Sequence, residues 1–520
     1  MSGLHKYNSK NMMKRALAFT LPIVLMFASV TTLFANEPDQ LPAETKSKGN
    51  GMGSGPKQKP NIILILADDL GIGNVSVYGA DKFKTPNIDQ LAATGIRFQR
   101  CYSEPLCAPA RAKILTGRFN FRTGMTSNSS QRVMKPSNEV LMCTPLHHAG
   151  YVTASVGKWH LSSEPLAWGF DQEMTIPGGS YWAGQRMQDG TDYQIDKSGA
   201  VSERSGSAAG KKLSTWNGNY TENGQKKILP PNQYMPDVLN QFAIDFVTTA
   251  TKANKPFFLY YPMSHIHYPI LRTPDSGPNE SLSQYYQDNV AYMDKLVGKL
   301  MSTLKALNIE QNTLVIFAGD NGTVPAFRAF STIDGGKQLS GCKFTMLEGG
   351  AHVPMIAHWP GTTPKGQVCN NLVDSTDFFT TFTELAGGNI PTDRPMDGVS
   401  FAPLLFGKPL TTPRDWIFVL LGTFWYDENL QWKLHENGEL NDMSHAPFSE
   451  PVVPKSSSNP EALAARSFLQ NVLNQLNPKA GKAGIGNTKC DRDTISYTKH
   501  YCGSLESLLS NPDGSQPGEE

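Results

Sequence analysis

Apolar segments that lead directly into polar residues limit most strongly what this chain can fold into. The clearest are 61–67, 256–261 and 313–318, which lead into Asp68-Asp69, Ser264 to His267 and Asp320-Asn321. A strand without polar alternation is typical of a parallel sheet that helices cover on both faces. The carboxyl ends of such strands are where α/β sheets bind ligands. The sequence therefore predicts a site at this edge of the sheet.

Two of these polar groups suggest a metal. Asp68 and Asp69 repel one another when both are ionised, and a cation between them relieves that repulsion. The alternative for any such pair is the polar start of a loop. Segment 151–156 is a further predicted strand, and it leads into Lys158 and His160, which alternation places on one side.

Helical patterns alternate with the predicted strands. They cover 85–92, 234–249, 290–304 and 374–386. This alternation predicts an α/β fold, with a mainly parallel central sheet sandwiched by helices. We expect this domain to span residues 60–410. Short strands at 416–421 and 431–435 and a helix at 461–476 predict a smaller C-terminal α+β subdomain over 411–520.

The first 59 residues have the pattern of a targeting segment and a linker. Basic residues precede an apolar run over 16–34, and Ala35 is the expected last residue removed. This pattern is typical of a secretory signal over 1–35, although an anchor helix is the alternative because the run approaches spanning length. Residues 36–59 are Gly-, Lys- and Pro-rich, which predicts a flexible leader. We expect a secreted or periplasmic protein without stable membrane association after signal removal.

The charge argues against a nucleic-acid partner, and the cysteine content raises the question of disulfides. The chain has 47 basic and 46 acidic residues, so no global field draws it to nucleic acid. It has seven cysteines, and in an oxidising compartment those not used in chemistry can form disulfides. If Cys107 is catalytic, the remaining six are Cys101, Cys143, Cys342, Cys369, Cys490 and Cys502. Their pairing stays open, with Cys490–Cys502 the local candidate.

The segment around Cys107 predicts a thiol at a strand-to-helix junction. Pro109 suits the first turn of a helix, where no backbone N–H is needed. Arg111 would lie one turn from Cys107, close enough to stabilise an anion. Taken alone, a buried structural thiol is the more usual explanation of such a cysteine.

Six short motifs in this order resemble the type I sulfatase family of the alkaline phosphatase superfamily, over about residues 60–435. They are Ala67 to Gly71, Thr85 to Asp89, Cys107 to Arg118 (Cys-x-Pro-x-Arg with Leu-Thr-Gly-Arg), Gly157 to Leu161, Asp320 to Gly322 and Glu348 to Gly350. The resemblance implies an alkaline-phosphatase-like fold and hydrolysis of sulfate esters. It also implies an arylsulfatase-like enzyme, and because we expect an exported protein, a sulfated saccharide is the substrate we expect.

The resemblance implies a modified residue and a metal. A formylglycine-generating maturation enzyme would oxidise Cys107 to formylglycine, whose aldehyde hydrates to a gem-diol. One divalent cation, usually Ca²⁺, would bind Asp68, Asp69, Asp320, Asn321 and residue 107. Carboxylate and amide oxygens without thiolate or imidazole are ligands for a hard cation, which leaves Mg²⁺ open as well.

The resemblance also assigns roles in a two-step reaction. Arg111, Lys158 and Lys343 would neutralise charge on the sulfate oxygens. Asp320 would accept a proton from the attacking hydroxyl, and His267 or Lys343 would donate one to the departing alcohol. His160 would accept the proton whose removal expels sulfate. His265 is a rival to His267, which we favour because it precedes Pro269 in a His-x-Pro pattern.

The chain departs from the family pattern at three places. Ala110 stands where Ser is common, Cys342 precedes Lys343 where Gly is common, and Ala351-His352 replaces Ile-Arg. A phosphonate or phosphate monoester hydrolase with the same aldehyde is one alternative function, and a non-catalytic sulfated-glycan binder is another. We expect specificity to depend on residues 176–233, on the surroundings of His352 and on the C-terminal subdomain.

Overall fold

The computed structural model of the protein describes residues 59–176, 219–230, 233–267, 270–277 and 280–481. It also gives the backbone of three short antiparallel strands, β5 (Gln185–Arg186), β6 (Asp192–Ile195) and β7 (Val201–Glu203). The predicted signal and leader, and Cys490 and Cys502, lie outside the described residues. In the part of the chain that is described, no helix combines the length and apolar character needed to cross a membrane.

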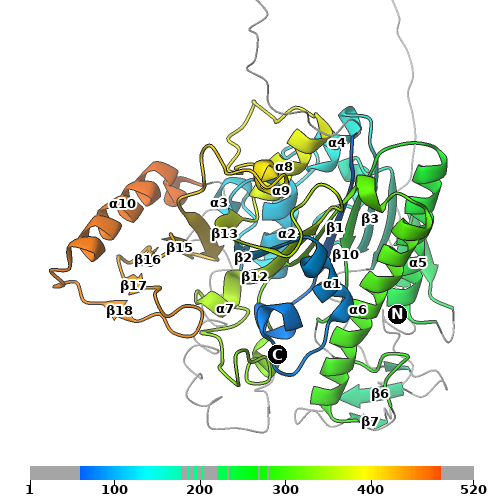
Figure 1. Cartoon of the computed structure of the whole chain (residues 1–520), viewed down its shortest axis with the longest axis horizontal. Coiled ribbons are helices and arrows are strands. Elements are labelled where there is room, and N and C mark those ends of the chain that lie inside the picture. The colour runs from blue at the N-terminus through cyan, green and yellow to red at the C-terminus, as the bar shows by residue number, and fades with distance from the viewer. Residues whose placement is uncertain are drawn as a thin grey trace, which may run out of the picture. The chain divides into compact units, whose positions relative to one another are not determined.

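A ten-stranded sheet forms the centre of the fold (Figure 1). In spatial order it contains β13 (Gln367–Asp374), β2 (Ile96–Tyr102), β12 (His352–His358), β11 (Thr313–Gly319), β1 (Asn61–Ala67), β10 (Phe257–Pro262), β3 (Val152–Lys158), β4 (Gln172–Ile176), β8 (Asn219–Glu222) and β9 (Gln225–Ile228). Strands β11, β1, β10, β3 and β4 are parallel to their neighbours in this series. The parallel centre of the sheet, and with it the predicted fold class, is confirmed.

The sheet is mixed at its two sides. Strand β12 runs antiparallel to β11 and β2, because the short helix α7 (Glu348–Ala351) leads directly into it from the edge at which β11 ends. The hairpin β8–β9 joins β4 in antiparallel fashion. This hairpin is the fully described part of the expected specificity segment 176–233, most of which lies outside the described residues.

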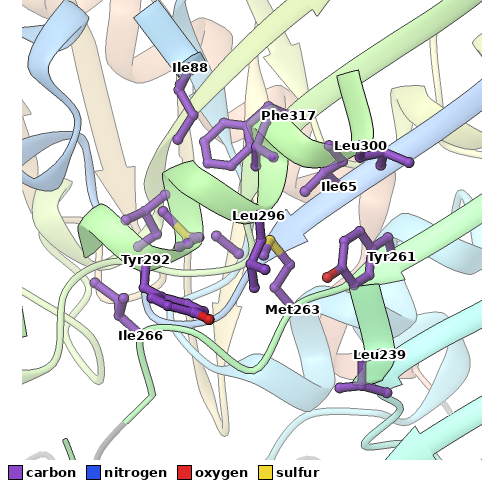
Figure 2. Packing of buried hydrophobic residues seen from close by; sticks show 14 of the residues in the cluster. Ile65, Ile88, Leu239, Tyr261, Met263, Ile266, Tyr292, Leu296, Leu300 and Phe317 are labelled. Atoms are coloured by element: carbon purple, nitrogen blue, oxygen red, sulfur yellow. The ribbon is translucent and has the colours of Figure 1, made fainter. Parts of the chain in front are cut away.

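Helices cover both faces of the sheet. On one face α1 (Pro86–Thr94), α5 (Met235–Lys252) and α6 (Leu282–Ala306) pack on Ile63 and Ile65. Figure 2 shows this packing, with Leu296 and Leu300 of α6 near Ile65 and Phe317. On the other face α2 (Cys107–Thr116), α4 (Cys143–His148), α8 (Asp377–Ala386) and α9 (Ala402–Leu405) pack on alternate residues of β1. Burying one leucine side chain in either cluster contributes about 1.5–3 kcal/mol, so the packing on both faces stabilises the sheet.

A second, antiparallel sheet forms the C-terminal part. Its strands are β14 (Ile417–Leu421), β15 (Phe424–Glu428), β16 (Trp432–His435), β17 (Leu440–Asp442) and β18 (Val452–Val453), in that order. Helix α10 (Pro460–Leu476) and the short helix α3 (Asn120–Thr123) share a hydrophobic cluster with it. The predicted strands at 416–421 and 431–435 belong to this sheet, but β15 lies between them. The domain boundaries at 410 and 411 stay predictions.

The described cysteines form no disulfide with one another. Cys101, Cys143, Cys342 and Cys369 are all buried, as is Cys107. Of the pairings that the sequence left open, those among these four are absent from the described residues, and those that involve Cys490 or Cys502 stay open. Burial in the core, where they pack as small apolar groups, accounts for them instead.

Candidate active site

The carboxyl ends of neighbouring parallel strands bring the predicted acidic residues together. Ala67 of β1 lies opposite Gly319 of β11, so the residues that follow each strand are adjacent. The backbone N–H of Asp69 donates to Oδ1 of Asp320 over 3.0 Å, and Nδ2 of Asn321 donates to Oδ1 of Asp69 over 2.8 Å. Strand order alone thus assembles this part of the site.

Helix α2 delivers Cys107 and Arg111 to the same point. The helix begins at Cys107, and Pro109 occupies its first turn as predicted. The Cys107 Sγ lies 3.5 Å from Oδ1 of Asp69. Arg111 donates to Oδ2 of Asp320 and to the carbonyl oxygen of Lys158, each over 2.7 Å. Its guanidinium also lies 3.3 Å from Oδ1 of Asp68, so Arg111 joins three strand ends.

Two lysines complete the charge balance. Lys158, the last residue of β3, places Nζ 2.6 Å from Oδ2 of Asp68. Lys343 places Nζ 2.8 Å from Oδ1 of Asp69, so the neighbouring Cys342 does not displace it. With Arg111 these cations match Asp68, Asp69 and Asp320 in number, and all six side chains are at most 5% exposed. Addition of a divalent cation would therefore leave the site positive, which suits an anionic ester.

The histidines separate into two environments. Nε2 of His267 lies 3.8 Å from Oδ2 of Asp69, and its side chain is 12% exposed, so it lies at the margin of the cluster. His160 follows β3 with φ of 59°, and its Nδ1 is buried without a hydrogen-bond partner in the described chain. His265 instead lies in the core, with Nε2 3.0 Å from the hydroxyl of Tyr234. The structure thus brings the imidazole of His267, and not that of His265, to the acidic side chains.

Burial and charge shift the pKa values of these groups. Burial would raise the pKa of Asp68, but Lys158, His267 and Arg111 together hold it well below its usual range. Burial and the nearby Asp68 raise the pKa of Asp320 to about 7. Burial raises the pKa of the Cys107 thiol well above its ordinary value, so the unmodified side chain is a poor nucleophile. Burial and Lys158 lower the pKa of His267 to about 4.

The side chains present fit a hard divalent cation. Asp68, Asp69, Cys107 and His267 offer ligand atoms that all lie within 4.8 Å of one another. Within the described residues, the buried Oδ1 atoms of Asp68 and Asn321 have no hydrogen-bond partner. Buried oxygens are seldom left unsatisfied, and a hard cation with oxygen ligands would satisfy them. His267 was not among the predicted ligands, because no spacing in the sequence ties it to them.

The side chain of His352, near which we expected part of the specificity, lies inside the protein. His352 is 6% exposed, and its ring stacks on Tyr102 with the centroids 5.0 Å apart. Its Nδ1 lies 3.1 Å from Glu348, and its Nε2 lies 2.9 Å from the carbonyl oxygen of Gln99. Both ring nitrogens are therefore engaged inside the protein. The departure from the Arg of the family pattern thus falls on a side chain that makes internal contacts.

Other residues near the site were missed from the sequence. The side chain of Asn128 accepts a hydrogen bond from the N–H of Ala108 in the first turn of α2, over 3.1 Å. Glu104 and Lys113 flank Cys107 in the chain and are completely buried. A lysine inside the apolar run 112–115 was the available signal, because a buried lysine requires a counter-ion.

Comparisons with known proteins agree with this geometry. The family model described as Sulfatase matches residues 60–388. The N-acetylgalactosamine-6-sulfatase of Canis lupus familiaris is 35% identical over 384 residues, 69% of this chain and 69% of that protein. Arylsulfatase G of Rattus norvegicus is 33% identical over 378 residues, 68% of this chain and 70% of that protein.

A solved structure matches over most of the chain. Ps i-CgsB in complex with k-i-k-neocarrahexaose superimposes with a TM-score of 0.65 at 26% identity, over 87% of this chain and 99% of that chain. The match extends beyond the residues of the family model, so the similarity of fold is not confined to residues 60–388. From the family model, the relatives and the site, the chain belongs to the sulfatase family and is a sulfuric ester hydrolase.

Proposed function

We propose that the protein hydrolyses a sulfate ester of a sulfated saccharide with a formylglycine made from Cys107. The observation that carries the proposal is the position of Cys107, which is completely buried beside Asp69 at the start of a helix that also holds Arg111. The hydrated aldehyde would supply two hydroxyls on one carbon, one to attack sulfur and one whose deprotonation expels sulfate. A maturation enzyme that generates formylglycine is then a required partner.

One Ca²⁺ per chain is part of the proposal. Asp68, Asp69, Asp320, Asn321 and residue 107 would hold it, and when bound it would act as a Lewis acid toward a sulfate oxygen. The buried Oδ1 of Asn321, which has no hydrogen-bond partner in the described chain, supports this assignment. The equal numbers of acidic and basic groups support it too, because without added positive charge the site would not favour an anion.

The remaining side chains act on charge and protons. Lys158 and Lys343 hold ammonium groups against Asp68 and Asp69, where they would stabilise negative charge on the sulfate oxygens, together with Arg111. His267 or Lys343 would protonate the departing alcohol. The partial exposure of His267 supports a position on the solvent side of the site, from which that alcohol would leave. His160 would accept the proton in the second step. Its unsatisfied Nδ1 leaves room for either tautomer.

The relatives support a sugar substrate. One is an N-acetylgalactosamine-6-sulfatase, and one solved neighbour is in complex with a hexaose. The basic and apolar pattern over 1–35 supports export to the periplasm or the outside of the cell, which is where a polymeric sulfated sugar would be met.

Peptide mapping by mass spectrometry tests the proposal directly. We expect residue 107 of active protein to carry the aldehyde or its hydrate, and we expect Cys107→Ala to abolish turnover of an aryl sulfate while the protein stays folded. A fully active protein with an unmodified thiol at this position would rule the mechanism out. Rates on aryl phosphate and aryl phosphonate distinguish a phosphoester hydrolase, and a panel of sulfated sugars identifies the substrate.

A further inference from the structure

One edge of the C-terminal sheet, formed by strand β14, makes hydrogen bonds to side chains instead of to another strand. Strand β14 is the first strand of that sheet and pairs with β15 on one side. On its other side, the N–H and carbonyl of Phe418 and the N–H of Leu420 are taken by the side chains of Asp374, Lys113 and Glu104. An edge strand leaves such groups open, so these side chains take the place of a neighbouring strand.

Lys113 lies at the centre of this arrangement. Its Nζ donates to the carbonyl oxygen of Phe418 over 2.6 Å, and it lies 3.0 Å from Oδ2 of Asp374 and 3.3 Å from Oε1 of Glu104. All three charged side chains have no exposure to solvent. A buried ammonium group held by two carboxylates has no freedom to move without breaking an ion pair.

The carboxylates reach the same strand independently. Oε2 of Glu104 accepts a hydrogen bond from Leu420 N–H over 2.6 Å, and Oδ2 of Asp374 accepts one from Phe418 N–H over 3.3 Å. Oδ1 of Asp374 accepts from the N–H and hydroxyl of Thr376. Asp374 is thereby fixed at the end of β13, and Glu104 is fixed in the loop that leads to Cys107.

We propose that Glu104, Lys113 and Asp374 are positioning residues for the hydrolytic reaction, because they fix helix α2 against strand β14. Glu104 precedes Cys107 by three residues, and Lys113 follows Arg111 by two. The segment that carries Cys107 and Arg111 is thus held on both sides to one rigid strand. None of the three touches the acidic cluster, so they act through the position of α2.

The effect on rate follows from the short contacts in the site. Arg111 makes two hydrogen bonds of 2.7 Å, and Cys107 lies 3.5 Å from Asp69. A displacement of about 1 Å at a reacting group can cost about 10²-fold in rate. Substrate binding depends less on this displacement, since Arg111 is the one cation of the three proposed for the sulfate that is on α2, whereas Lys158 and Lys343 are carried by other elements.

The test compares Lys113→Met and Glu104→Gln with the wild-type protein. Asp294→Asn is the matched control: Asp294 is also buried and accepts hydrogen bonds from Asn87 and Ile88, but it joins helices α1 and α6, which carry none of the site residues. The assay measures kcat and KM for an aryl sulfate, each rate being divided by the fraction of chains modified at residue 107. Amide hydrogen exchange of residues 107–116 is measured on the same samples.

We expect Lys113→Met to lower kcat about 10²-fold, with KM changed less than about 3-fold, and Glu104→Gln to lower kcat by about 10-fold. Both should exchange faster over 107–116, and Asp294→Asn should do neither. If Lys113→Met does not fold, Glu104→Gln alone tests the proposal. This variant should fold, because its side-chain oxygen can still accept the hydrogen bond from the N–H of Leu420.

A kcat within about 3-fold of wild type in the folded variants overturns the proposal, whether or not exchange is faster, because the cluster would then be merely structural. The inference assumes that residue 107 reacts as proposed. The two can fail separately: an unmodified thiol in active protein refutes the formylglycine, whereas the variants still report whether α2 must be held in place.

Discussion

Removal of the Arg111 guanidinium is the most direct perturbation of the charge balance in the site. Arg111 has no exposure and lies against Asp320 and Asp68. Arg111→Met keeps an unbranched apolar chain but leaves Asp320 with the N–H of Asp69 as its remaining hydrogen-bond donor in the described chain. It also leaves the carbonyl oxygen of Lys158 without the guanidinium donor.

The magnitude follows from these losses. Breaking a buried ion pair by removing one partner costs about 3–5 kcal/mol, because the other charge stays buried. Loss of one group that stabilises transition-state charge costs about 10²–10³-fold in kcat. In chelated protein the stability loss depends on pH. Burial and Asp68 already raise the pKa of Asp320 to about 7, and removal of Arg111 raises it further. The variant therefore goes on losing stability with rising pH beyond the point where the wild type stops, so its loss relative to wild type is larger at pH 8 than at pH 5.

Urea unfolding at pH 8 and pH 5, together with kcat for an aryl sulfate, measures these effects. Arg122→Met is the control, since Arg122 pairs with Asp397 over 2.9 Å but is 23% exposed, and such pairs contribute about 1 kcal/mol or less. Equal stability of Arg111→Met and Arg122→Met at pH 8, or a kcat within about 3-fold of wild type, would refute the reasoning about Arg111.

Three further outcomes follow from the structure. Chelation should abolish turnover and lower the melting temperature, both restored by Ca²⁺, and Asp69→Asn should show neither metal response; a wild-type melting temperature indifferent to chelator would contradict the metal assignment. Asp427 is buried with both carboxylate oxygens unpartnered in the described chain, and burial raises its pKa to about 8. The unfolded group ionises near 3.8 while the folded one resists ionisation up to about 8, so stability is lost as pH rises through that window. Asp427→Asn should be as stable as wild type near pH 4 and more stable at pH 8, and equal urea midpoints at both pH values would disprove this. His267→Ala should lower kcat more for poor leaving groups than for activated aryl sulfates, whereas His265→Ala should mainly reduce stability; kinetics show whether the two variants differ.

The centre of the fold and most of the site were predictable because they depend on local patterns. A buried parallel strand is recognisable from its continuous apolar residues, and the residues after it must lie at one edge of the sheet. Asp68, Asp69, Asp320 and Asn321 follow from this rule. The strand register then makes them neighbours, because Ala67 and Gly319, the last residues of β1 and β11, lie opposite one another.

The contacts between distant segments were not predictable. The antiparallel direction of β12 depends on where α7 enters the sheet, which no periodicity records. In the sequence, Lys113 interrupts an apolar run. Its partner Glu104 lies nine residues before it, and its partner Asp374 lies far along the chain. Pairing of buried charges is a tertiary property, so the sequence can indicate that a partner exists without indicating which one.

The C-terminal sheet is attached to the site region by a second set of buried charges. Lys433 of β16 places Nζ 2.7 Å from Glu450 and 3.7 Å from Glu348, and Glu450 also accepts the backbone N–H of Glu348 at the start of α7. The helix that begins at Glu348 contacts the site from the other side, because the carbonyl oxygen of Gly350 accepts the N–H of Gly322, next to Asn321.

Two elements that border the site, α2 and α7, are therefore tied to one small sheet by charged side chains with almost no exposure. For α2 the link is the hydrogen bonds that the ion-paired Lys113 and Glu104 make to β14, and for α7 it is the contacts of Glu348 with Lys433 and Glu450. Such pairs contribute little net stability, since desolvation offsets their attraction, but they strongly disfavour any displaced arrangement that separates the charges. Apolar packing at the same places would tolerate small shifts of α2 at modest cost. The charged attachments thus favour one placement of Cys107 and Arg111 over nearby alternatives, which is the requirement that a preorganised reaction centre imposes on its supporting residues.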